Sequence, residues 1–418
     1  MSKPADAAPK RAGMLPVAEA LAIVLDVARD HLTAEEQVAV QACDGRVLAR
    51  DLVSLRTQPP FDASAMDGFA IHAADSDPPG RPLRLIGESA AGHPFDSPVG
   101  PGEAIRISTG AKMPAGADTV LIQEDAEVSG DTVIARAVVR PDRHIRRAGR
   151  DFRAGDTLLG AGRRLAPGSI ALAGAMNHAA LPVYRRPRVA ILATGDELAL
   201  PGSTENPEAI IATNGYAVAA LCRRAGAEVV ELDIARDTPE SVHAAFDAAE
   251  AWRADCLVTI GGASVGVHDL IAGIAAERGA KTLFRKVALR PGKPFTFSTV
   301  DRGRRSLIAG LPGNPISALV CARLFLAPMI AAMQGDAAAG EADLETAVLG
   351  VDLPANDERQ DHLRAVLTRD SAGRVIATPL GDQDSSLLAI YAQAQALIVR
   401  APLAPPAHAG ETCPILRI

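Results

Sequence analysis

The sequence has few aromatic residues and no uninterrupted apolar run long enough to cross a membrane. Aromatic residues make up 3% of its 418 residues, with a single tryptophan. Proteins that bind single-stranded nucleic acid stack the bases on aromatic side chains, so we expect no nucleic-acid partner. The most apolar stretch, residues 316–333, is interrupted by Arg323 and Pro328. We therefore expect no membrane segment and no membrane partner.

Cysteine is also scarce, and the net charge is small. The five cysteines lie far apart, and no two of them have the spacing of metal ligands. We expect them to be reduced and mostly buried, as in a cytoplasmic protein. Lysine and arginine number 43, aspartate and glutamate number 50, and the net charge is −7. This mild acidity argues against a general polyanion binder but does not exclude a local basic site.

The chain is too long for a single hydrophobic core. At roughly 150 residues per domain, its length predicts about three domains. Changes in composition along the chain suggest where they begin and end. The expected units are a disordered tail (1–13), a helical linking domain (14–50 and 141–187), a small β domain (51–140), an α/β domain (188–333) and a C-terminal β-barrel (344–418).

The α/β domain is predicted from strands that alternate with helices. Residues 188–194 and 256–260 are short apolar runs typical of buried strands, and each precedes a stretch with helical composition. Connections of this kind are right-handed crossovers and favour a doubly wound, mostly parallel sheet. We expect further strands over 228–234, 281–289 and 294–300, and a helix that begins at Thr238 and Pro239. Outside this domain we expect helices over 15–30 and 163–181, and a hairpin turn at 129–131.

Several loops that follow the predicted strands carry glycines and charged side chains. Ligands of open α/β sheets bind beyond the carboxyl ends of the strands, so these loops are expected to meet. Backbone N–H groups of glycine loops suit oxyanions, carboxylates suit Mg²⁺, and cations offset a phosphate charge. Taken singly, a carboxylate here could be a helix cap and a lysine could be solvated. The loops contain Gly195, Asp196 and Glu197; Arg236 and Asp237; Gly261 to Gly266 with Asp269; Arg290 to Pro294; and Pro312 to Pro315.

A different chemistry is suggested by the pattern Gly262-x-Ser264-x-Gly266, which matches a nucleophile elbow. A serine hydrolase would also need a downstream acid and histidine on the same sheet. His268 is too close to Ser264, and the later histidines, His362 and His408, fall in the predicted barrel. The hydrolase is therefore the weaker alternative.

Motifs along most of the chain resemble one family. The stretches, in chain order, are FDASAMDGFA, RISTGAKMPAGAD, IRRAGRD, ATGDEL, GGASVG followed by Asp269, RPGKP and GLPGNPISA, and the match runs from about residue 14 to the C-terminus. Together they resemble the molybdopterin molybdenumtransferases, or MoeA-type proteins, which are related to the E domain of gephyrin. Since gephyrin also binds receptors, a non-catalytic scaffold is a further alternative. The retained carboxylates argue against lost catalysis.

The resemblance implies an activity and a set of partners. The family inserts molybdate into adenylylated molybdopterin, releases AMP and uses Mg²⁺. Its members are elongated homodimers, and the molybdopterin adenylyltransferase is a further partner implied for this chain. The α/β domain is expected to resemble that adenylyltransferase. The active cleft is expected between this domain and the β domain of the other subunit, with the C-terminal barrel outside the chemistry.

The resemblance also assigns roles to residues. From the β domain and the arginine-rich stretch that follows it, the cleft is expected to take Asp67, Thr109, Arg146 and Asp151. From the α/β domain it is expected to take Glu197, Asp237, Asp269, Gly261, Gly262, Ser264, Gly266, Lys286, Arg290, Lys293, Pro312, Gly313, Asn314 and Pro315. Asp269 and Glu197 are expected to position Mg²⁺. Phe69, Ala263 and Arg290 stand where the family usually has tyrosine, valine and lysine, and Arg290 could alter the fit to a tetrahedral oxyanion.

Overall fold

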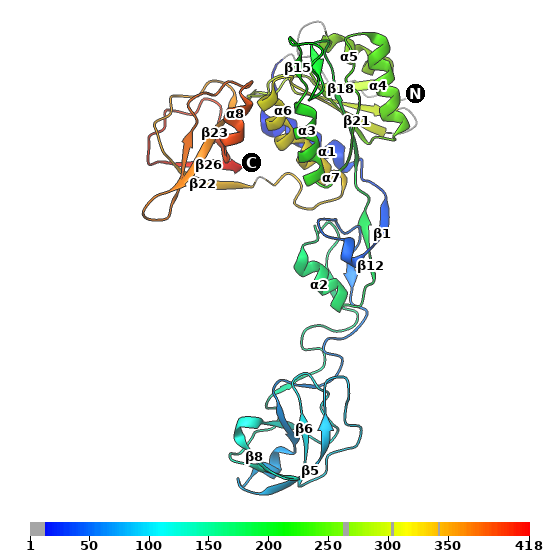
Figure 1. Cartoon of the computed structure of the whole chain (residues 1–418), viewed down its shortest axis with the longest axis vertical. Coiled ribbons are helices and arrows are strands. Elements are labelled where there is room, and N and C mark those ends of the chain that lie inside the picture. Colours follow the sequence, from blue (N-terminus) through cyan, green and yellow to red (C-terminus); the bar gives the residue numbers. More distant parts are fainter. Residues whose placement is uncertain (1–12, 262–266, 302–304, 342) are drawn as a thin grey trace, which may run out of the picture.

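The computed structural model describes residues 13–261, 267–301, 305–341 and 343–418. The chain is elongated, with the small β domain at one end and the α/β domain beside the C-terminal barrel at the other (Figure 1). A linking domain joins the two ends. The predicted tail at 1–13 lies, apart from Gly13, outside the described residues.

The linking domain is built on a two-stranded antiparallel pair. Its strands are β1 (Glu35–Ala39) and β12 (Ala180–Tyr184). Its helix α2 (Pro167–Ala175) is shorter than the predicted helix over 163–181. Pro167 occupies the first position, which suits proline, and Asn177 has a positive φ of 76° that breaks the helix before β12 begins. The short elements nearby are η1 (Val40–Ala42), β2 (Leu52–Val53) and β11 (Thr157–Leu159).

Helix α1 (Val17–Arg29) forms where a helix is predicted, but it packs in the α/β domain rather than in the linking domain. Its residues Ala20, Val24 and Ala28 are fully buried and share a hydrophobic cluster with the α/β sheet. Their spacing of four residues forms one apolar stripe, which is stable only against another apolar surface. The position of α1 in space therefore follows its buried face, not its place in the sequence.

The small β domain is a six-stranded sheet in the order β7-β4-β6-β5-β9-β8. The predicted hairpin at 129–131 is confirmed, since Gly130 turns the chain with φ of 58° between two paired strands. The strands are β4 (Gly68–Ile71), β5 (Pro82–Ser89), β6 (Glu103–Ile107), β7 (Thr119–Ile122), β8 (Ala126–Ser129) and β9 (Thr132–Ala135). The shorter pieces are β3 (Ala63–Ser64), β10 (Ile145–Arg146), η2 (Ala73–Ser76) and η3 (Gln123–Asp125).

Gly68 allows a close approach of two strands in this sheet. A Cβ atom at this position would lie 2.1 Å from the carbonyl oxygen of Leu121. We therefore expect Gly68→Ala to destabilise the β domain by about 1–3 kcal/mol or more, the range of overpacked core substitutions. The control is Gly168→Ala in α2, where nothing lies within 4 Å of the added methyl group. Urea unfolding followed by circular dichroism measures both, and an unchanged midpoint for Gly68→Ala would contradict the close approach.

The α/β domain contains a six-stranded sheet in the order β16-β13-β17-β21-β20-β18. The first four strands are parallel, β20 is antiparallel to β21, and β18 is antiparallel to β20. The predicted mostly parallel sheet is thus confirmed. The strands are β13 (Arg188–Ala193), β16 (Glu228–Glu231), β17 (Cys256–Ile260), β18 (Ala280–Phe284), β20 (Thr296–Asp301) and β21 (Arg305–Leu311), with the small pair β14 (Leu198–Ala199) and β15 (Ile210–Ile211).

Helices cover both faces of this sheet, and each face has its own hydrophobic cluster. On one face lie α1, α3 (Asn214–Arg224) and the run formed by α6 (Pro315–Cys321), η4 (Ala322–Leu326) and α7 (Ala327–Met333). On the other face lie α4 (Pro239–Ala251) and α5 (Val267–Glu277). The predicted start of α4 is confirmed, because the Thr238 hydroxyl accepts a hydrogen bond from the Ser241 amide.

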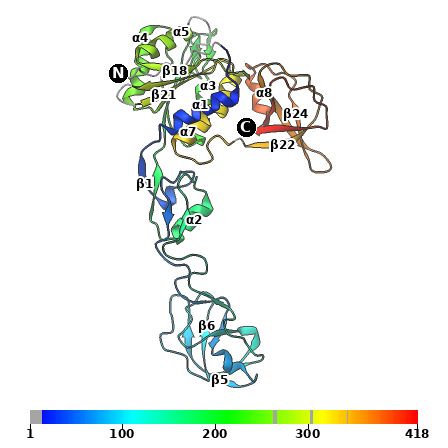
Figure 2. The ribbon, with the colours of Figure 1, turned by 180° about the vertical axis from the view of Figure 1, so that it is seen from behind.

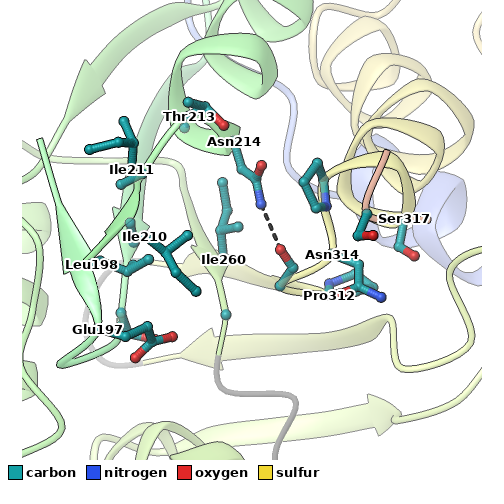
Figure 3. Close-up of a pocket in the computed structure, with 18 of the residues that line it drawn as sticks. Glu197, Leu198, Ile210, Ile211, Thr213, Asn214, Ile260, Pro312, Asn314 and Ser317 are labelled. Atoms are coloured by element: carbon teal, nitrogen blue, oxygen red, sulfur yellow. Dashed lines mark hydrogen bonds between the residues drawn. The ribbon is translucent and has the colours of Figure 1, made fainter. Parts of the chain in front are cut away.

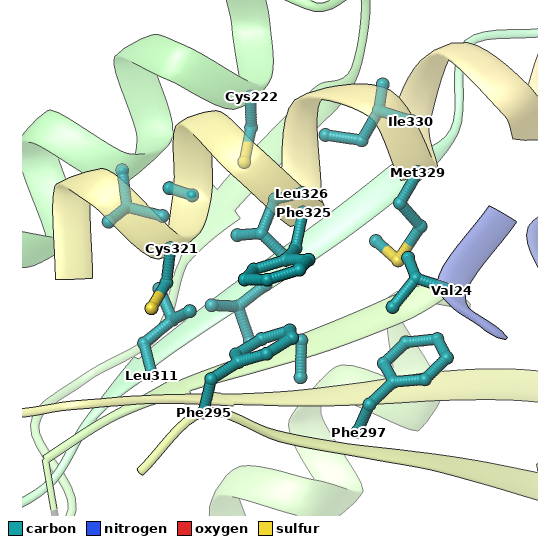
Figure 4. Packing of buried hydrophobic residues seen from close by; sticks show 14 of the residues in the cluster. Val24, Cys222, Phe295, Phe297, Leu311, Cys321, Phe325, Leu326, Met329 and Ile330 are labelled. Carbon is teal, nitrogen blue, oxygen red and sulfur yellow. The ribbon is translucent and has the colours of Figure 1, made fainter. Parts of the chain in front are cut away.

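The helical run from Pro315 to Met333 is long and apolar enough to cross a membrane, judged by length and composition alone. However, 72% of its most apolar window is buried inside the protein, as in the core helix of a folded domain. Its middle turn, η4, is a π-helix directly before Pro328, which has no amide hydrogen to donate to the preceding turn. Figure 4 shows Phe325 of this run packed on Phe295.

The C-terminal domain is a closed barrel of five strands. The order β23-β24-β22-β26-β25 closes because β25 also pairs with β23. The bounds are β22 (Leu344–Leu349), β23 (Gln360–Arg369), β24 (Val375–Pro379), β25 (Ala396–Arg400) and β26 (Thr412–Arg417), with helix α8 (Leu388–Gln393). The strand predicted over 281–289 is confirmed as β18 up to Phe284, but its second half is wrong, because the chain leaves the α/β sheet after Phe284. It then forms β19 (Leu289–Arg290), which pairs with β23 of the barrel.

Candidate active site

A cavity of about 570 Å³ lies beyond the carboxyl ends of β13, β17 and β21. This is the edge at which ligands of open α/β sheets bind. Figure 3 shows its wall, with Glu197, Leu198 and Ile210 on one side and Asn314 and Ser317 on the other. The cavity therefore combines apolar surface with a small number of polar groups, as small-molecule sites do.

Glycines let the loops after neighbouring strands approach each other closely. Gly261 has φ of 108°, and a Cβ atom there would lie 2.7 Å from the carbonyl oxygen of Thr194. A Cβ atom on Gly313 would lie 3.5 Å from the Cα atom of Gly261. The predicted meeting of these loops is thus confirmed for Gly261 and Gly313, and larger side chains at Gly261 would separate the strands that they follow.

The turn from Pro312 to Pro315 is held from two directions. The Asn214 side-chain amide donates a hydrogen bond to the Gly313 carbonyl at 2.7 Å (Figure 3). The Asn314 side-chain amide donates to the Ser385 hydroxyl at 2.8 Å, and the Ile316 amide donates to the Ser385 carbonyl at 3.0 Å. The turn is therefore fixed between the α/β domain and the C-terminal domain.

The C-terminal barrel was expected to lie outside the chemistry, and this stays a prediction, but a loop of this domain reaches the wall of the cavity. Ser386 lines the cavity, and the neighbouring Ser385 holds the turn opposite. The long-range packing that brings this loop over the α/β domain has no local signal in the sequence. Asn214 was missed for a similar reason, since an asparagine that opens a helix is also a common cap.

Glu197 lines the cavity, and two further carboxylates, Asp196 and Asp237, lie beside it outside the lining. The Asp237 amide donates to an oxygen of Asp196 at 3.2 Å. Burial raises the pKa of Asp237, and the negative charges of Asp196 and Glu197 raise it further. Its Oδ1 is buried and has no hydrogen-bond partner among the described residues. The arrangement leaves excess negative charge, which a bound cation would neutralise.

These carboxylates do not form a complete metal site by themselves. Within the described ranges, no three histidine, cysteine, aspartate or glutamate side chains are grouped closely enough to hold a metal ion. Mg²⁺ usually takes only one or two protein carboxylates, with substrate phosphates and water as its other ligands. Glu197 and Asp237, with its unpaired Oδ1, fit that requirement.

Four predicted site residues after β17 lie wholly or partly outside the described part of the chain. Gly262, Ser264 and Gly266 lie outside the described residues. The backbone of Asp269 lies in the first turn of α5, and its side chain is outside the described part of the chain. The predicted oxyanion loop, the nucleophile elbow and the role of Asp269 as a metal ligand stay predictions.

The three predicted cations differ in their surroundings. Lys286 and Lys293 are exposed, and neither has an ion pair or hydrogen bond from its amino group to a described residue. The Arg290 guanidinium instead donates to Asp357 at 2.7 Å and to the side-chain oxygen of Asn356 at 3.0 Å. It also donates to both carboxylate oxygens of Asp361. Arg290 therefore fastens the barrel to the α/β domain. Two carboxylates neutralise it in the described part of the chain, and its role as an anion ligand stays a prediction.

The predicted residues of the β domain form a second group, at the opposite end of the chain from the cavity (Figures 1 and 2). Asp67 and Thr109 meet directly, since the Thr109 amide donates to Asp67 at 2.7 Å. Arg146 in β10 lies opposite Ala63, and Asp151 follows on the same segment. All four predicted side chains are exposed. One chain therefore does not bring the two groups of predicted residues together.

Comparison with known sequences gives a match in each part of the chain. Residues 15–176 match the MoeA N-terminal region (domain I and II), and residues 190–332 match a probable molybdopterin binding domain. Residues 346–418 match the MoeA C-terminal region (domain IV). The cavity described above is formed mainly by the second of these regions.

Two curated relatives and one solved structure cover nearly the whole chain. A molybdopterin molybdenumtransferase of Haemophilus influenzae is 33% identical over 401 residues, which span 94% of this chain and 98% of the relative. A molybdopterin molybdenumtransferase of Bacillus subtilis is 34% identical over 92% of this chain and 90% of the relative. The crystal structure of the molybdopterin biosynthesis MoeA protein from Pyrococcus horikoshii superimposes with a TM-score of 0.80 and 25% identity, and covers 97% of this chain and all of that chain.

Proposed function

The chain belongs to the MoeA-type molybdopterin molybdenumtransferases, and we propose that it inserts molybdate into adenylylated molybdopterin and releases AMP. The observation that carries this proposal is the cavity at the carboxyl edge of the α/β sheet. Glu197 lines it with Asp237 nearby, and Pro294, which follows Lys293 in the chain, lines it as well. Both substrates are oxyanions, which such a combination of carboxylate-held cation and lysines suits.

The fit of the carboxylates supports Mg²⁺ as the cofactor. Glu197 and Asp237 would hold the ion, with Asp269 as a further candidate, and phosphate oxygens of the substrate would complete its shell. When bound, Mg²⁺ would polarise the phosphoanhydride that links the nucleotide to molybdopterin. The protein residues have separate tasks: Lys286 and Lys293 orient the anions, and the turn from Pro312 to Pro315 shapes the wall against which the substrate rests.

The two separated groups of residues support a composite site in a homodimer. Asp67 and Thr109 are exposed and bonded to each other, yet the same chain offers them no contact with the cavity. In an isologous dimer of elongated chains, the β domain of one subunit would reach the α/β domain of the other. Arg146 and Asp151 would then complete the anion-binding surface from the partner side.

The alternative chemistries have less support. A serine hydrolase would depend on Ser264, and the family assignment favours the transferase. Labelling by a fluorophosphonate probe, lost in Ser264→Ala, would instead favour the hydrolase. A purely structural scaffold would leave the carboxylates at the cavity without a role.

We place the reaction in the cytoplasm, with a molybdopterin adenylyltransferase supplying the substrate.

The direct test is to supply adenylylated molybdopterin, molybdate and Mg²⁺ to the purified protein. We expect AMP release that depends on molybdate, together with cofactor that activates a molybdenum-free apoenzyme. AMP release and cofactor formation should disappear together when Mg²⁺ is chelated. The absence of both products in the presence of all three components would refute the proposed function.

The contact between Ser385 and Asn314 gives a smaller, specific prediction. Ser385→Ala removes one neutral hydrogen bond that holds the turn over the cavity. Such a bond contributes about 0.5–1.5 kcal/mol, so we expect kcat/KM to fall by roughly three- to tenfold. Thermal stability should change little. The control is Ser371→Ala in an exposed barrel turn, and an equal loss of activity in both variants would contradict a role for the Ser385 contact.

A further inference from the structure

A second cavity, of about 410 Å³, lies where the linking domain meets the α/β domain. It is distinct from the cavity at the carboxyl edge of the sheet. Helix α3 begins with Asn214 at the first cavity and ends with Arg224 at the second. Because α3 has 11 residues and is therefore roughly 16 Å long, the two cavities lie about that far apart.

The second cavity is unusually rich in arginine. Its lining contains five arginines and three carboxylates, so it carries an excess of two positive charges. The arginines come from separate segments that meet only in the folded chain. They are Arg164 before α2, Arg186 after β12, Arg223 and Arg224 at the end of α3, and Arg323 in the π-helical turn η4.

The carboxylates of the protein leave part of this positive charge unpaired. Arg164 is paired with Asp336 at 2.8 Å. Arg223 and Arg323 are paired with Glu231 and Asp343, neither of which lines the cavity. Among the described residues, the Arg186 side chain donates to the Gly226 carbonyl, at 3.3 Å, and has no ion pair. Arg224 has no hydrogen bond or ion pair to a residue within the described ranges.

Two other cations act on Arg186: Arg164, which lines the cavity, and Arg46, which does not. Burial lowers the pKa of Arg186, and the positive charges of Arg46 and Arg164 lower it further. A helix C-terminus favours cations, which accounts for Arg223 and Arg224 at the end of α3. It does not account for Arg164, Arg186 or Arg323, which face the same space from other segments.

We propose that this cavity binds a small phosphate-bearing anion, such as a phosphomonoester or a diphosphate. The planar guanidinium group of arginine has N–H donors spaced to match phosphate oxygens. Arginines that face one space from several directions can therefore surround a compact, multiply charged anion. The volume falls within the usual range for small-molecule sites. The bound anion would lie between the linking domain and the α/β domain, where Arg164 already contacts Asp336.

The test is titration calorimetry with inorganic pyrophosphate as the probe. Because the first cavity is also expected to bind anions, the titration is made on Lys286→Ala/Lys293→Ala as well as on the wild type. We expect this lysine variant to retain a saturable site. Adding Arg186→Gln and Arg224→Gln should weaken that site at least about tenfold, as expected for lost charge-assisted hydrogen bonds.

Two controls keep the test decisive. Arg253→Gln makes the same charge change as a single cavity substitution, at an exposed position of the α/β domain outside the cavity, and should leave binding unchanged. Arg224→Gln alone, at an exposed residue, gives a second variant if the combined one does not fold. The proposal is overturned if the lysine variant shows no saturable binding up to about 10 mM, or if the cavity substitutions leave its affinity unchanged.

Discussion

Replacing Glu197 by glutamine is expected to lower kcat/KM for cofactor formation by about 100-fold or more, the scale seen when partners of a catalytic metal are removed. Glu197 lines the cavity, and its charge helps to raise the pKa of Asp237. Glutamine has nearly the same shape but no charge, so a bound cation would lose an anionic ligand while the fold stays intact.

The same substitution has a second readout that does not depend on turnover. Without the charge of Glu197, the pKa of Asp237 should move down towards its ordinary value, because one cause of its increase has been removed. NMR titration of the Asp237 carboxyl group measures this shift. The control is Glu205→Gln at an exposed position outside the cavity lining. Near wild-type kcat/KM in Glu197→Gln would show that Glu197 has no part in the reaction.

Replacing Phe325 by alanine is expected to destabilise the α/β domain by about 3–5 kcal/mol, as for other buried aromatic residues. Phe325 is fully buried and stacks on Phe295 with ring centroids 4.5 Å apart and planes 9° apart (Figure 4). The substitution would lose this stacking contact and leave a cavity between the helical run and the sheet.

The single tryptophan allows this loss to be measured in one domain of a multidomain chain. Trp252 follows α4 in the α/β domain, so its fluorescence during urea unfolding reports on that domain. The control is Phe61→Ala in the β domain, where the ring is 37% exposed. We expect the control to leave the fluorescence transition in place. A shift of equal size in both variants would contradict the buried stack as the source of stability.

The parts of the fold that were predicted correctly have strong local patterns. Parallel strands buried on both faces are continuous apolar runs, which is why β13 and β17 were found from the sequence. Thr238 and Pro239 mark the start of α4 through their own chemistry. The loops after these strands could then be placed at one edge of the sheet by topology alone.

The parts that were missed depend on contacts between distant segments. The strand predicted over 281–289 breaks because Lys286 pairs with Leu15 through their backbones, and β19 then joins the barrel. The contact of Arg290 with Asp361 was not predicted either, because Asp361 lies 71 residues further along the chain. Periodicity and turn chemistry carry no information about such pairs, so neither contact could have been derived from the local sequence.

The most direct test of the composite site combines two variants that are each expected to be inactive. Asp67→Asn and Glu197→Gln are expressed together with different affinity tags, and the mixed dimer is purified through both tags. If each site takes its β domain from the partner, the mixed dimer contains one intact site and should have about half the wild-type activity. A mixed dimer no more active than either variant alone would contradict a site formed between two subunits.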